Sequence, residues 1–148
     1  MLNIGDDWNR QAHAKGTLNM VETKIYIGLN DLATNTQLFE NEKYIRILRN
    51  VCYSYKVPFS FNVQEGGYIY ENGEYARETS LVLTLINVDK TVASDIAKDL
   101  CAFFHQESVL VAESQIQAHF VCESLEHGEP NPDNRQSEVP NLGNRKQV

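Results

Sequence analysis

The sequence is poor in cysteine and histidine, and neither residue type forms a recognisable metal or disulfide pattern. Its 148 residues include three cysteines, Cys52, Cys101 and Cys122. Their number is odd and no two form a Cys-x-x-Cys pair, which argues against a disulfide framework and a thiolate metal site. The four histidines are scattered and lack zinc-ligand spacing. We therefore predict no metal and no cofactor, and interpret the cysteines as small apolar residues in a reducing cytoplasm.

Positive charge and long apolar runs are also scarce. Lys and Arg number 13 against 20 Asp and Glu, a net charge of −7. This balance disfavours a nonspecific phosphate-binding surface, so we expect no nucleic-acid partner. The apolar runs fall far short of the roughly 18 residues that a membrane span needs, so we expect no membrane partner. The first residues lack a basic stretch followed by an apolar one, so no secretion signal is predicted and we expect a cytoplasmic protein.

What remains is the composition of one globular domain with polar ends. The chain is 42% apolar, and its length suits a single core. We predict a flexible leader over residues 1–22, in which Met20 could be a second start. A folded domain follows over 23–123. Residues 124–148 collect Gly, Pro, Asn and charges, and this composition predicts a disordered polar and acidic tail.

The first half of the domain shows a strand and then a helix. Residues 24–29 alternate and are rich in β-branched and aromatic side chains, which predicts a strand that ends at Asn30-Asp31. Apolar residues then recur at helical spacing, with Asn41 as the expected N-cap and Tyr55 near the end. Pro58 excludes a continuation of this helix, because its ring removes a donor and disfavours helical backbone before it.

The strongest local signal is a hairpin at Asn72-Gly73, a pair that favours a two-residue type I′ turn. That turn would set Tyr70 opposite Tyr75 and Tyr68 opposite Arg77. Gly66-Gly67 in the first arm predicts a bulge or a bend.

The second half repeats the strand and helix pattern. Residues 79–86 are nearly continuously apolar, which is typical of a central strand. Asp89 or Thr91 would cap a helix that ends near Phe104. Alternation over 108–122 then predicts a long last strand, which we expect to be bulged.

The order β-α-β-β-α-β predicts an α+β fold of the ferredoxin-like type, a two-layer sandwich with a four-stranded antiparallel sheet. Right-handed crossovers would place the first and third strands in the middle. One sheet face would be covered by helices, and the other would be solvated or buried in an oligomer. We expect that open face to carry Lys24, Tyr26 and Gly28, or the opposite parity of the first strand, together with Gln115, Gln117 and His119.

Two turn segments and one polar pair have both functional and structural interpretations. Gly28 to Asp31 could admit a ligand, although glycine, asparagine and aspartate are also ordinary turn residues. His105 to Ser108 could place a carboxylate, an amide and a hydroxyl at one end of the sheet, although a histidine also suits a helix C-terminus. Arg77-Glu78 is most simply a cross-strand polar pair. No nucleophile elbow supports a Ser-His-acid triad.

Three segments carry a family resemblance. They are Tyr26-Ile27-Gly28-Leu29-Asn30-Asp31, the Asn72-Gly73 hairpin and Gln106-Glu107-Ser108-Val109. Together they resemble small uncharacterised proteins of phages and prophages of Gram-positive bacteria, and at lower similarity the bacterial DUF3574 family, over residues 22–123. The resemblance implies a phage-infected or lysogenic bacterial cytoplasm and possible assembly through the sheet. It implies no biochemical role.

These observations favour a non-catalytic, homo-oligomeric binding module that takes a small molecule or a nucleotide at a subunit cleft. No catalytic residue is assigned. The candidate ligand-binding residues are Gly28, Asn30, Asp31, Arg77, Gln106 and Glu107. One alternative is a phage accessory protein that binds and blocks a host protein through an acidic surface. Another is a small enzyme that uses His119 or Glu113 on the open sheet face.

Overall fold

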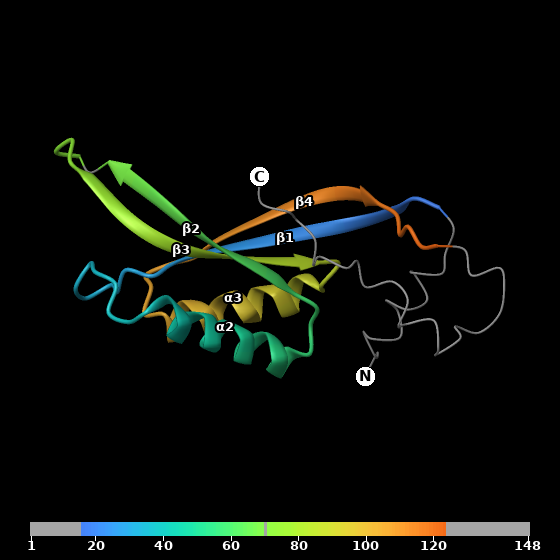
Figure 1. Cartoon of the computed structure of the whole chain (residues 1–148), viewed down its shortest axis with the longest axis horizontal. Coiled ribbons are helices and arrows are strands. Elements are labelled where there is room, and N and C mark those ends of the chain that lie inside the picture. The colour runs from blue at the N-terminus through green and yellow to red at the C-terminus, as the bar shows by residue number, and fades with distance from the viewer. Residues whose placement is uncertain (1–15, 70, 124–148) are drawn as a thin grey trace, which may run out of the picture.

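The sheet and both helices follow the predicted order. The computed structural model describes residues 16–69 and 71–123, with only the backbone of Tyr68. Its elements are β1 (Leu18–Gly28), α2 (Asn41–Tyr55), β2 (Ser60–Ile69), β3 (Tyr75–Ile86), α3 (Lys90–Phe103) and β4 (Leu110–Ala118). The four strands form one antiparallel sheet in the order β2-β3-β1-β4, and both helices cover the same face (Figure 1). The ferredoxin-like α+β fold is confirmed, with β1 and β3 in the middle.

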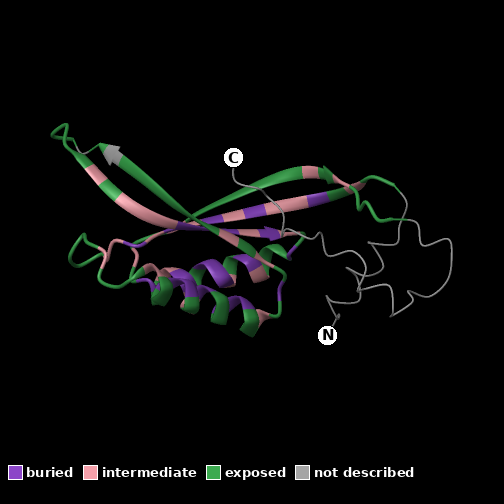
Figure 2. Ribbon diagram, viewed as in Figure 1, coloured by how far each residue is buried: buried purple, intermediate pink, exposed green. Residues whose placement is uncertain are grey.

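The hydrophobic core lies between the helices and the two central strands (Figure 2). Alternate residues of β1 and β3, and Leu29 just after β1, belong to the core and are fully buried: Ile25, Ile27, Leu29, Leu81, Leu83 and Leu85. The apolar stripes of the two helices meet them: Tyr44, Ile45, Leu48, Val51, Cys52, Ala93, Ile96, Ala97 and Leu100. Each fully buried aliphatic side chain stabilises the fold by roughly 1.5–3 kcal/mol relative to exposure. The same burial raises the pKa of the Cys52 thiol to about 12, because it disfavours the charged thiolate.

The helix starts differ slightly from the prediction. Asn41 is the first residue of α2 rather than its cap; Glu40 precedes it in extended backbone and makes no capping side-chain hydrogen bond. The Asn41 side chain instead accepts a hydrogen bond from Nε2 of Gln37 at 2.8 Å. Of the two candidates for α3, Asp89 is the cap, since its Oδ1 accepts from the backbone N–H of Thr91 at 2.8 Å.

The predicted hairpin register is wrong by one residue. Ile69 pairs with Tyr75, and Gly67, not Tyr68, stands opposite Arg77. A type I′ turn needs positive φ at both central residues, but only Gly73 of the pair has it, at +86°. A wider turn therefore replaces the two-residue loop. In this turn the backbone N–H of Glu74 donates to Oδ1 of Asn72 at 3.0 Å. Tyr70 lies outside the described residues.

No bulge is present at Gly66-Gly67, where a bulge or a bend was predicted, or in the last strand. The β2–β3 pairing runs without interruption from Ser60↔Thr84 to Ile69↔Tyr75, through both glycines. The β1–β4 pairing is equally regular, from Leu18↔Ala118 to Tyr26↔Leu110. The first strand is also longer than expected. It begins at Leu18, so residues 18–22, assigned to the leader, belong to the sheet. The rest of the predicted leader up to residue 15, and the predicted tail, lie outside the described residues.

The strands extend past one another at both ends of the sheet (Figure 1). The β2–β3 hairpin continues beyond the last β1–β3 pair, Gly28↔Ser80. We call this extension, residues 65–79, the hairpin arm. At the opposite end, β1 and β4 continue as a second ribbon beyond Glu22↔Ile86. The loop that follows β1 therefore lies at the base of the hairpin arm.

The open face is more apolar than predicted. Lys24 and Tyr26 do lie on it, opposite Ala112 and Leu110 of β4. The β4 residues on this face are therefore Leu110, Ala112, Ser114, Ile116 and Ala118. Gln115 and Gln117 stand opposite Val21 and Asn19 and belong to the other face, so their assignment was wrong. The reason is that the helices cover the middle strands: no β4 residue belongs to the core cluster, and the polar side of this edge strand stays exposed. His119 lies just beyond the end of β4.

Candidate functional site

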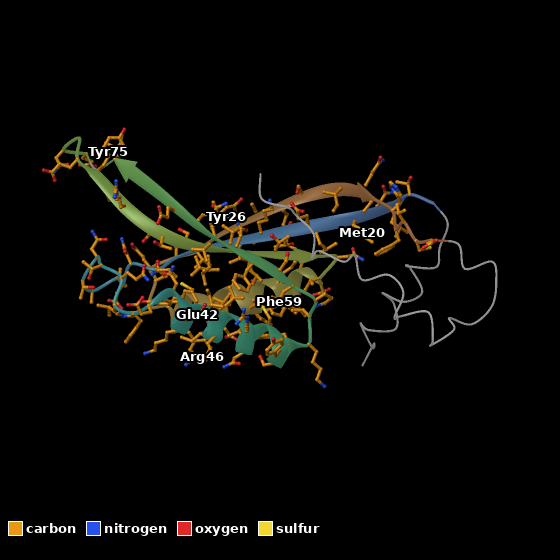
Figure 3. All side chains as sticks on the ribbon, in the orientation of Figure 1. Met20, Tyr26, Glu42, Arg46, Phe59 and Tyr75 are labelled. Carbon is orange, nitrogen blue, oxygen red and sulfur yellow. The ribbon has the colours of Figure 1, made fainter. Side chains whose placement is uncertain are left out.

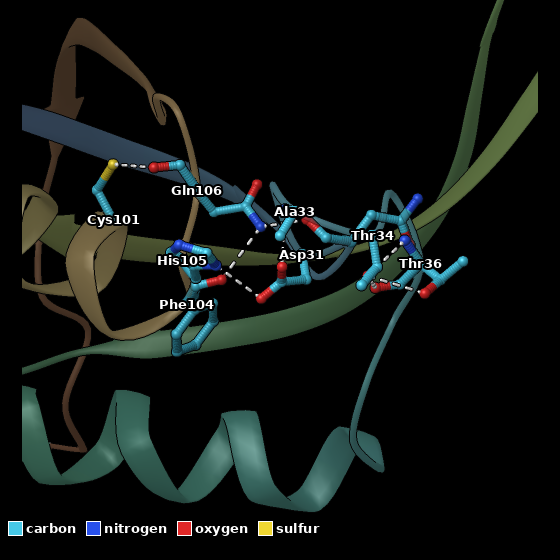
Figure 4. A network of polar contacts seen from close by, with 9 residues as sticks. Asp31, Ala33, Thr34, Thr36, Cys101, Phe104, His105 and Gln106 are labelled. Carbon is cyan, nitrogen blue, oxygen red and sulfur yellow. Dashed lines mark hydrogen bonds and ion pairs between the residues drawn. The ribbon is translucent and has the colours of Figure 1, made fainter.

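The two turn segments singled out in the sequence meet at one end of the sheet (Figure 4). Nε2 of Gln106 donates to the backbone oxygen of Asn30 at 2.6 Å. The backbone N–H of Leu32 donates to the oxygen of His105 at 3.0 Å. Nδ1 of His105 lies 2.9 Å from Oδ2 of Asp31. We call the residues Asn30, Asp31, His105 and Gln106 the turn cluster. It joins the end of β1 to the end of α3.

The end of α3 has a conformation that aims Gln106 at the β1 turn. His105 has a left-handed backbone, with φ of 50°, and its N–H donates to the oxygen of Ala102 at 3.2 Å. The N–H of Gln106 donates to the oxygen of Cys101 at 3.0 Å. These are the bonds of a helix C-terminus that ends in a left-handed residue. The helix-end interpretation of His105 is therefore confirmed, and the same geometry sets the direction of the Gln106 side chain.

Asp31 is held from two sides. Its Oδ1 accepts from the backbone N–H of Ala33 at 2.8 Å, an Asx turn, while Oδ2 contacts His105. The hydrogen bond from His105 is the largest cause that lowers the pKa of the Asp31 carboxyl, and the bond from Ala33 adds to it. Asp31 is therefore ionised at neutral pH, and both of its oxygens are occupied. Its role in this geometry is to position the loop.

Gly28 permits the close approach of a side chain. A Cβ atom built at Gly28 would lie 2.5 Å from Oε1 of Glu78, so any larger residue would displace that carboxylate. Oε2 of Glu78 also accepts from the backbone N–H of Asn30 at 3.3 Å. The sequence analysis missed Glu78 as a site residue. The register between β1 and β3 was the missing signal, because Gly28 pairs with Ser80, two residues along β3 from Glu78 and on the same face.

An open groove of about 450 Å³ lies between the hairpin arm and the loop after β1. We call it the Glu78 groove. Most of its lining residues have polar side chains: Asn30, Gln37, Glu65, Gly66, Arg77, Glu78 and Thr79. The ionisable side chains among these are two carboxylates and one guanidinium. Within the described residues none of these three side chains makes an ion pair.

The structure gathers most of the predicted site residues. Asn30 and Arg77 line the groove, and Nδ2 of Asn30 donates to the backbone oxygen of Arg77 at 3.2 Å. Gly28 leaves room for the Glu78 side chain, and Gln106 holds the backbone of Asn30. Asp31 contacts Ala33 and His105 and does not line the groove. Glu107 is exposed and does not line the groove. Their part in binding stays a prediction.

Other kinds of site find little support. Glu113 pairs with Thr23 on the helix side of the sheet, so it is not on the open face where an enzyme site was considered. In residues 16–69 and 71–123, no three His, Cys, Asp or Glu residues cluster as metal ligands would. No helix in the same part of the chain is long and apolar enough to cross a membrane.

Comparison with known proteins yields structural neighbours only. No family model and no curated protein matches the chain. A phage SAM lyase in complex with S-methyl-5′-thioadenosine is 20% identical with a TM-score of 0.51, over 68% of this chain and 89% of that one. The GlnK–ATP complex of B. subtilis is 13% identical with a TM-score of 0.46, over 66% and 82%. The periplasmic divalent cation tolerance protein CutA of Archaeoglobus fulgidus is 13% identical with a TM-score of 0.44, over 74% and 88%. The first likeness agrees with the fold derived above.

Proposed function

We propose that the protein is an oligomeric small-molecule-binding module whose Glu78 groove binds a positively charged nucleoside of the S-adenosylmethionine type. The observation that carries this proposal is the Glu78 carboxylate, held over Gly28 and against Asn30 at the groove. A carboxylate beside a groove provides a binding position for a cation.

The charge of the groove discriminates between ligand classes. Glu65 and Glu78 outnumber Arg77, and the whole chain carries −7. Two unit charges 4 Å apart interact by about 4 kcal/mol at an effective dielectric constant of 20. A sulfonium beside Glu78 gains attraction of this kind, whereas a triphosphate meets repulsion. Of the ligands considered from the sequence, an anionic nucleotide is therefore disfavoured and a cationic small molecule is favoured.

The groove also has the size and the groups that a nucleoside needs. Its volume of about 450 Å³ is within the range of roughly 300–1,000 Å³ of ligand sites. Gln37 and Thr79 offer an amide and a hydroxyl for ribose or base atoms. The phage SAM lyase that shares this fold holds S-methyl-5′-thioadenosine, an uncharged thioether, in its structure, which supports a thioadenosine ligand here; the preference for the charged sulfonium comes from the charge of the groove. It also supports the phage setting implied by the sequence resemblance.

We further propose that copies of the chain associate through the open sheet face. Leu110 on this face is 64% exposed, and the β4 residues beside it are small or apolar. Glu78 shares the side of the sheet that carries Ser80 and Gly28, so a second copy covering that face would reach the groove. The groove would then be a subunit cleft.

Adjacent residues of β4 provide a matched test of this assembly. Leu110→Glu places a charge on the open face, and Val111→Glu places the same charge on the opposite face, where Val111 is 40% exposed. We expect light scattering to show an oligomer for the wild type and Val111→Glu and a smaller species for Leu110→Glu. A wild-type monomer at tens of micromolar would refute the association.

Calorimetric titration tests the ligand. We expect S-adenosylmethionine to bind more tightly than S-adenosylhomocysteine, which lacks the sulfonium charge, and ATP to bind most weakly. Glu78→Gln should weaken S-adenosylmethionine binding by about tenfold, the cost of one charged contact. Glu113→Gln makes the same charge change away from the groove and should have no effect. Equal binding of all three ligands would contradict the charge argument.

Cleavage of the bound nucleoside is a second candidate function. The specific observation in its favour is that the neighbour of the same fold is named a lyase of this ligand. Incubation with S-adenosylmethionine followed by chromatography would show S-methyl-5′-thioadenosine if turnover occurs, and Glu78→Gln should reduce it. Binding without product would leave the binding module as the function.

A further inference from the structure

The cations of this acidic protein are concentrated on one helix. α2 and the residue that ends it carry Lys43, Arg46, Arg49 and Lys56, half of the lysines and arginines in the described part of the chain. All four are exposed. Glu42, in the first turn, is the only carboxylate of α2. Because the chain as a whole carries a net charge of −7, the positive charge of this helix is separated from the negative charge of the rest of the protein.

Lys43 and Arg46 lie on the outer face of α2, and Arg49 follows Arg46 by three residues on the helix. The helix buries Tyr44, Leu48 and Cys52 against the sheet, and spacings of three and four residues place Lys43, Arg46 and Tyr53 on the opposite side. Figure 3 shows Arg46 pointing away from the sheet. Tyr53 on the same face is 62% exposed, so an aromatic ring lies among the cations.

The charges of this face are not neutralised within the described residues. The ion pairs there are Lys24–Glu22 and His105–Asp31, and neither involves α2. Nζ of Lys43 instead lies 3.2 Å from the centre of the Phe39 ring. The Arg49 guanidinium lies 5.4 Å from the centre of the Phe61 ring. Aromatic contacts of this kind orient a cation without cancelling its charge.

A second observation, independent of charge, concerns the N-terminal end of the same helix. A cavity of about 360 Å³ lies there, between α2, the end of α3 and the loop after β1. Its lining includes the aromatic and aliphatic residues Phe39, Tyr44, Ile47, Phe103 and Phe104. Three ionisable residues, Asp31, Lys43 and His105, complete it. Phe103 is 63% exposed, an unusual position for a phenylalanine. Lys43 belongs to both the cavity and the basic face.

We propose that the outer face of α2 and this cavity form one docking surface for an acidic polypeptide segment of a partner protein. The segment places one large apolar side chain in the cavity and its carboxylates along Lys43, Arg46 and Arg49. Charge complementarity favours an acidic partner, and a buried apolar anchor surrounded by charged pairs is the usual anatomy of a protein interface. A nucleic acid is disfavoured, because the rest of the surface is negative and a phosphate backbone offers no apolar anchor. This surface is separate from the Glu78 groove and does not depend on the function proposed for it.

Fluorescence anisotropy with two synthetic peptides tests the proposal on the full chain. Both probes are glutamate-rich nonapeptides, one with a central phenylalanine and the other with alanine there. We expect the phenylalanine peptide to bind, and its affinity to fall with added salt. The double variant Arg46→Glu/Arg49→Glu should weaken it by at least about tenfold. Phe103→Ala should weaken the phenylalanine peptide by about fivefold and leave the alanine peptide unchanged.

Matched variants separate a docking surface from general attraction. Lys90→Glu/Lys98→Glu makes the same charge change on exposed residues of α3, and Tyr75→Ala removes an exposed ring from the hairpin arm. Neither should change binding by more than about twofold. Because all the altered residues are exposed, we expect each variant to melt like the wild type. The proposal is overturned if the wild type fails to bind the phenylalanine peptide up to about 1 mM. It is also overturned if the α2 and α3 charge-reversal variants weaken peptide binding equally. A third contrary result would be that single-stranded DNA of equal charge binds the protein more tightly than the peptide does.

Discussion

The helix-covered core and the turn cluster occupy neighbouring parts of one sheet but are held by opposite kinds of interaction. The core is a set of fully buried aliphatic side chains such as Leu83, in contact with two helices. The turn cluster consists of polar, partly exposed residues joined by a few directional contacts, among them Asp31–His105 and Gln106–Asn30. Apolar contacts are many and replaceable, whereas each polar contact here fixes one particular group.

This difference separates stability from site geometry. A substitution in the core should lower the free energy of unfolding and leave the groove intact in the molecules that fold. A substitution in or beside the turn cluster should do the reverse, since little apolar area is lost but the positions of Asn30 and Glu78 change. The predictions that follow test this separation.

Leu83→Ala should give the largest loss of stability. Leu83 is fully buried in the core on β3, and large-to-small substitutions at such sites cost about 2–5 kcal/mol. Its neighbour Thr84 faces the other side of the sheet and is only partly buried, so Thr84→Ala should cost less than about 1 kcal/mol. Urea unfolding at equilibrium measures both. Equal losses would mean that the two faces contribute equally to stability.

The contrast between the two regions also explains what the sequence could predict. The core follows from periodicity: alternate apolar residues in β1 and helical stripes ending near Tyr55 and Phe104 predict elements, order and fold. Burial imposes these patterns along the whole of each element. Local errors at a cap or a turn, such as Asn41 at α2, therefore leave the fold prediction unchanged.

The site was only partly predictable, because its geometry depends on register. Gly28, Asn30, Asp31 and Gln106 are turn residues with visible chemistry, so the sequence pointed to them. Glu78 was interpreted only as part of a cross-strand polar pair, because the pairing of Gly28 with Ser80, which brings its carboxylate over the glycine, is not visible in the sequence. That pairing joins strands 52 residues apart in sequence. The hairpin register itself shifts by one residue with the turn around Gly73, and a shift of one exchanges the two faces.

Gly28→Ala should have a small effect on stability and a large one on the groove. The new methyl group would meet the end of the flexible Glu78 side chain, which can rotate away, so we expect a cost below about 1 kcal/mol. The displaced carboxylate should weaken S-adenosylmethionine binding by about tenfold. Adding Gly28→Ala to Glu78→Ala should weaken binding no further, because the two substitutions remove the same contact.

Gly66→Ala is the matched control for this variant. Gly66 also lines the groove, but a Cβ there would lie 3.9 Å from the nearest atom, the backbone oxygen of Glu78, which is an ordinary contact. Calorimetric titration of both variants should show weakened binding for Gly28→Ala alone. If both keep wild-type affinity, the approach of Glu78 to Gly28 does not define the site.

Asp31→Asn should give the smallest effect, one that is visible mainly in its pH dependence. The hydrogen bond from His105, with a smaller effect of the Ala33 N–H, lowers the pKa of Asp31 in the folded state below the ordinary value of 3.8. A carboxyl whose folded pKa is lowered contributes stability above its unfolded pKa and loses that contribution as the pH falls through the folded pKa. The wild type should therefore be more stable than Asp31→Asn at about pH 5, and the gap should close as the pH is lowered below 3.8 through the lowered pKa of the folded state. Urea unfolding across this range measures the gap.

A companion variant identifies the partner responsible for that gap. His105→Asn removes the imidazole and keeps a residue type that tolerates the left-handed backbone at this position. Because the His105 contact is the largest cause of the lowered pKa, His105→Asn should lose most of the wild-type pH dependence below pH 5. A full wild-type dependence in this variant would assign the effect to the Ala33 hydrogen bond instead. The turn cluster would then be held by the Asx turn at Asp31, and the bridge to α3 would contribute to position but not to stability.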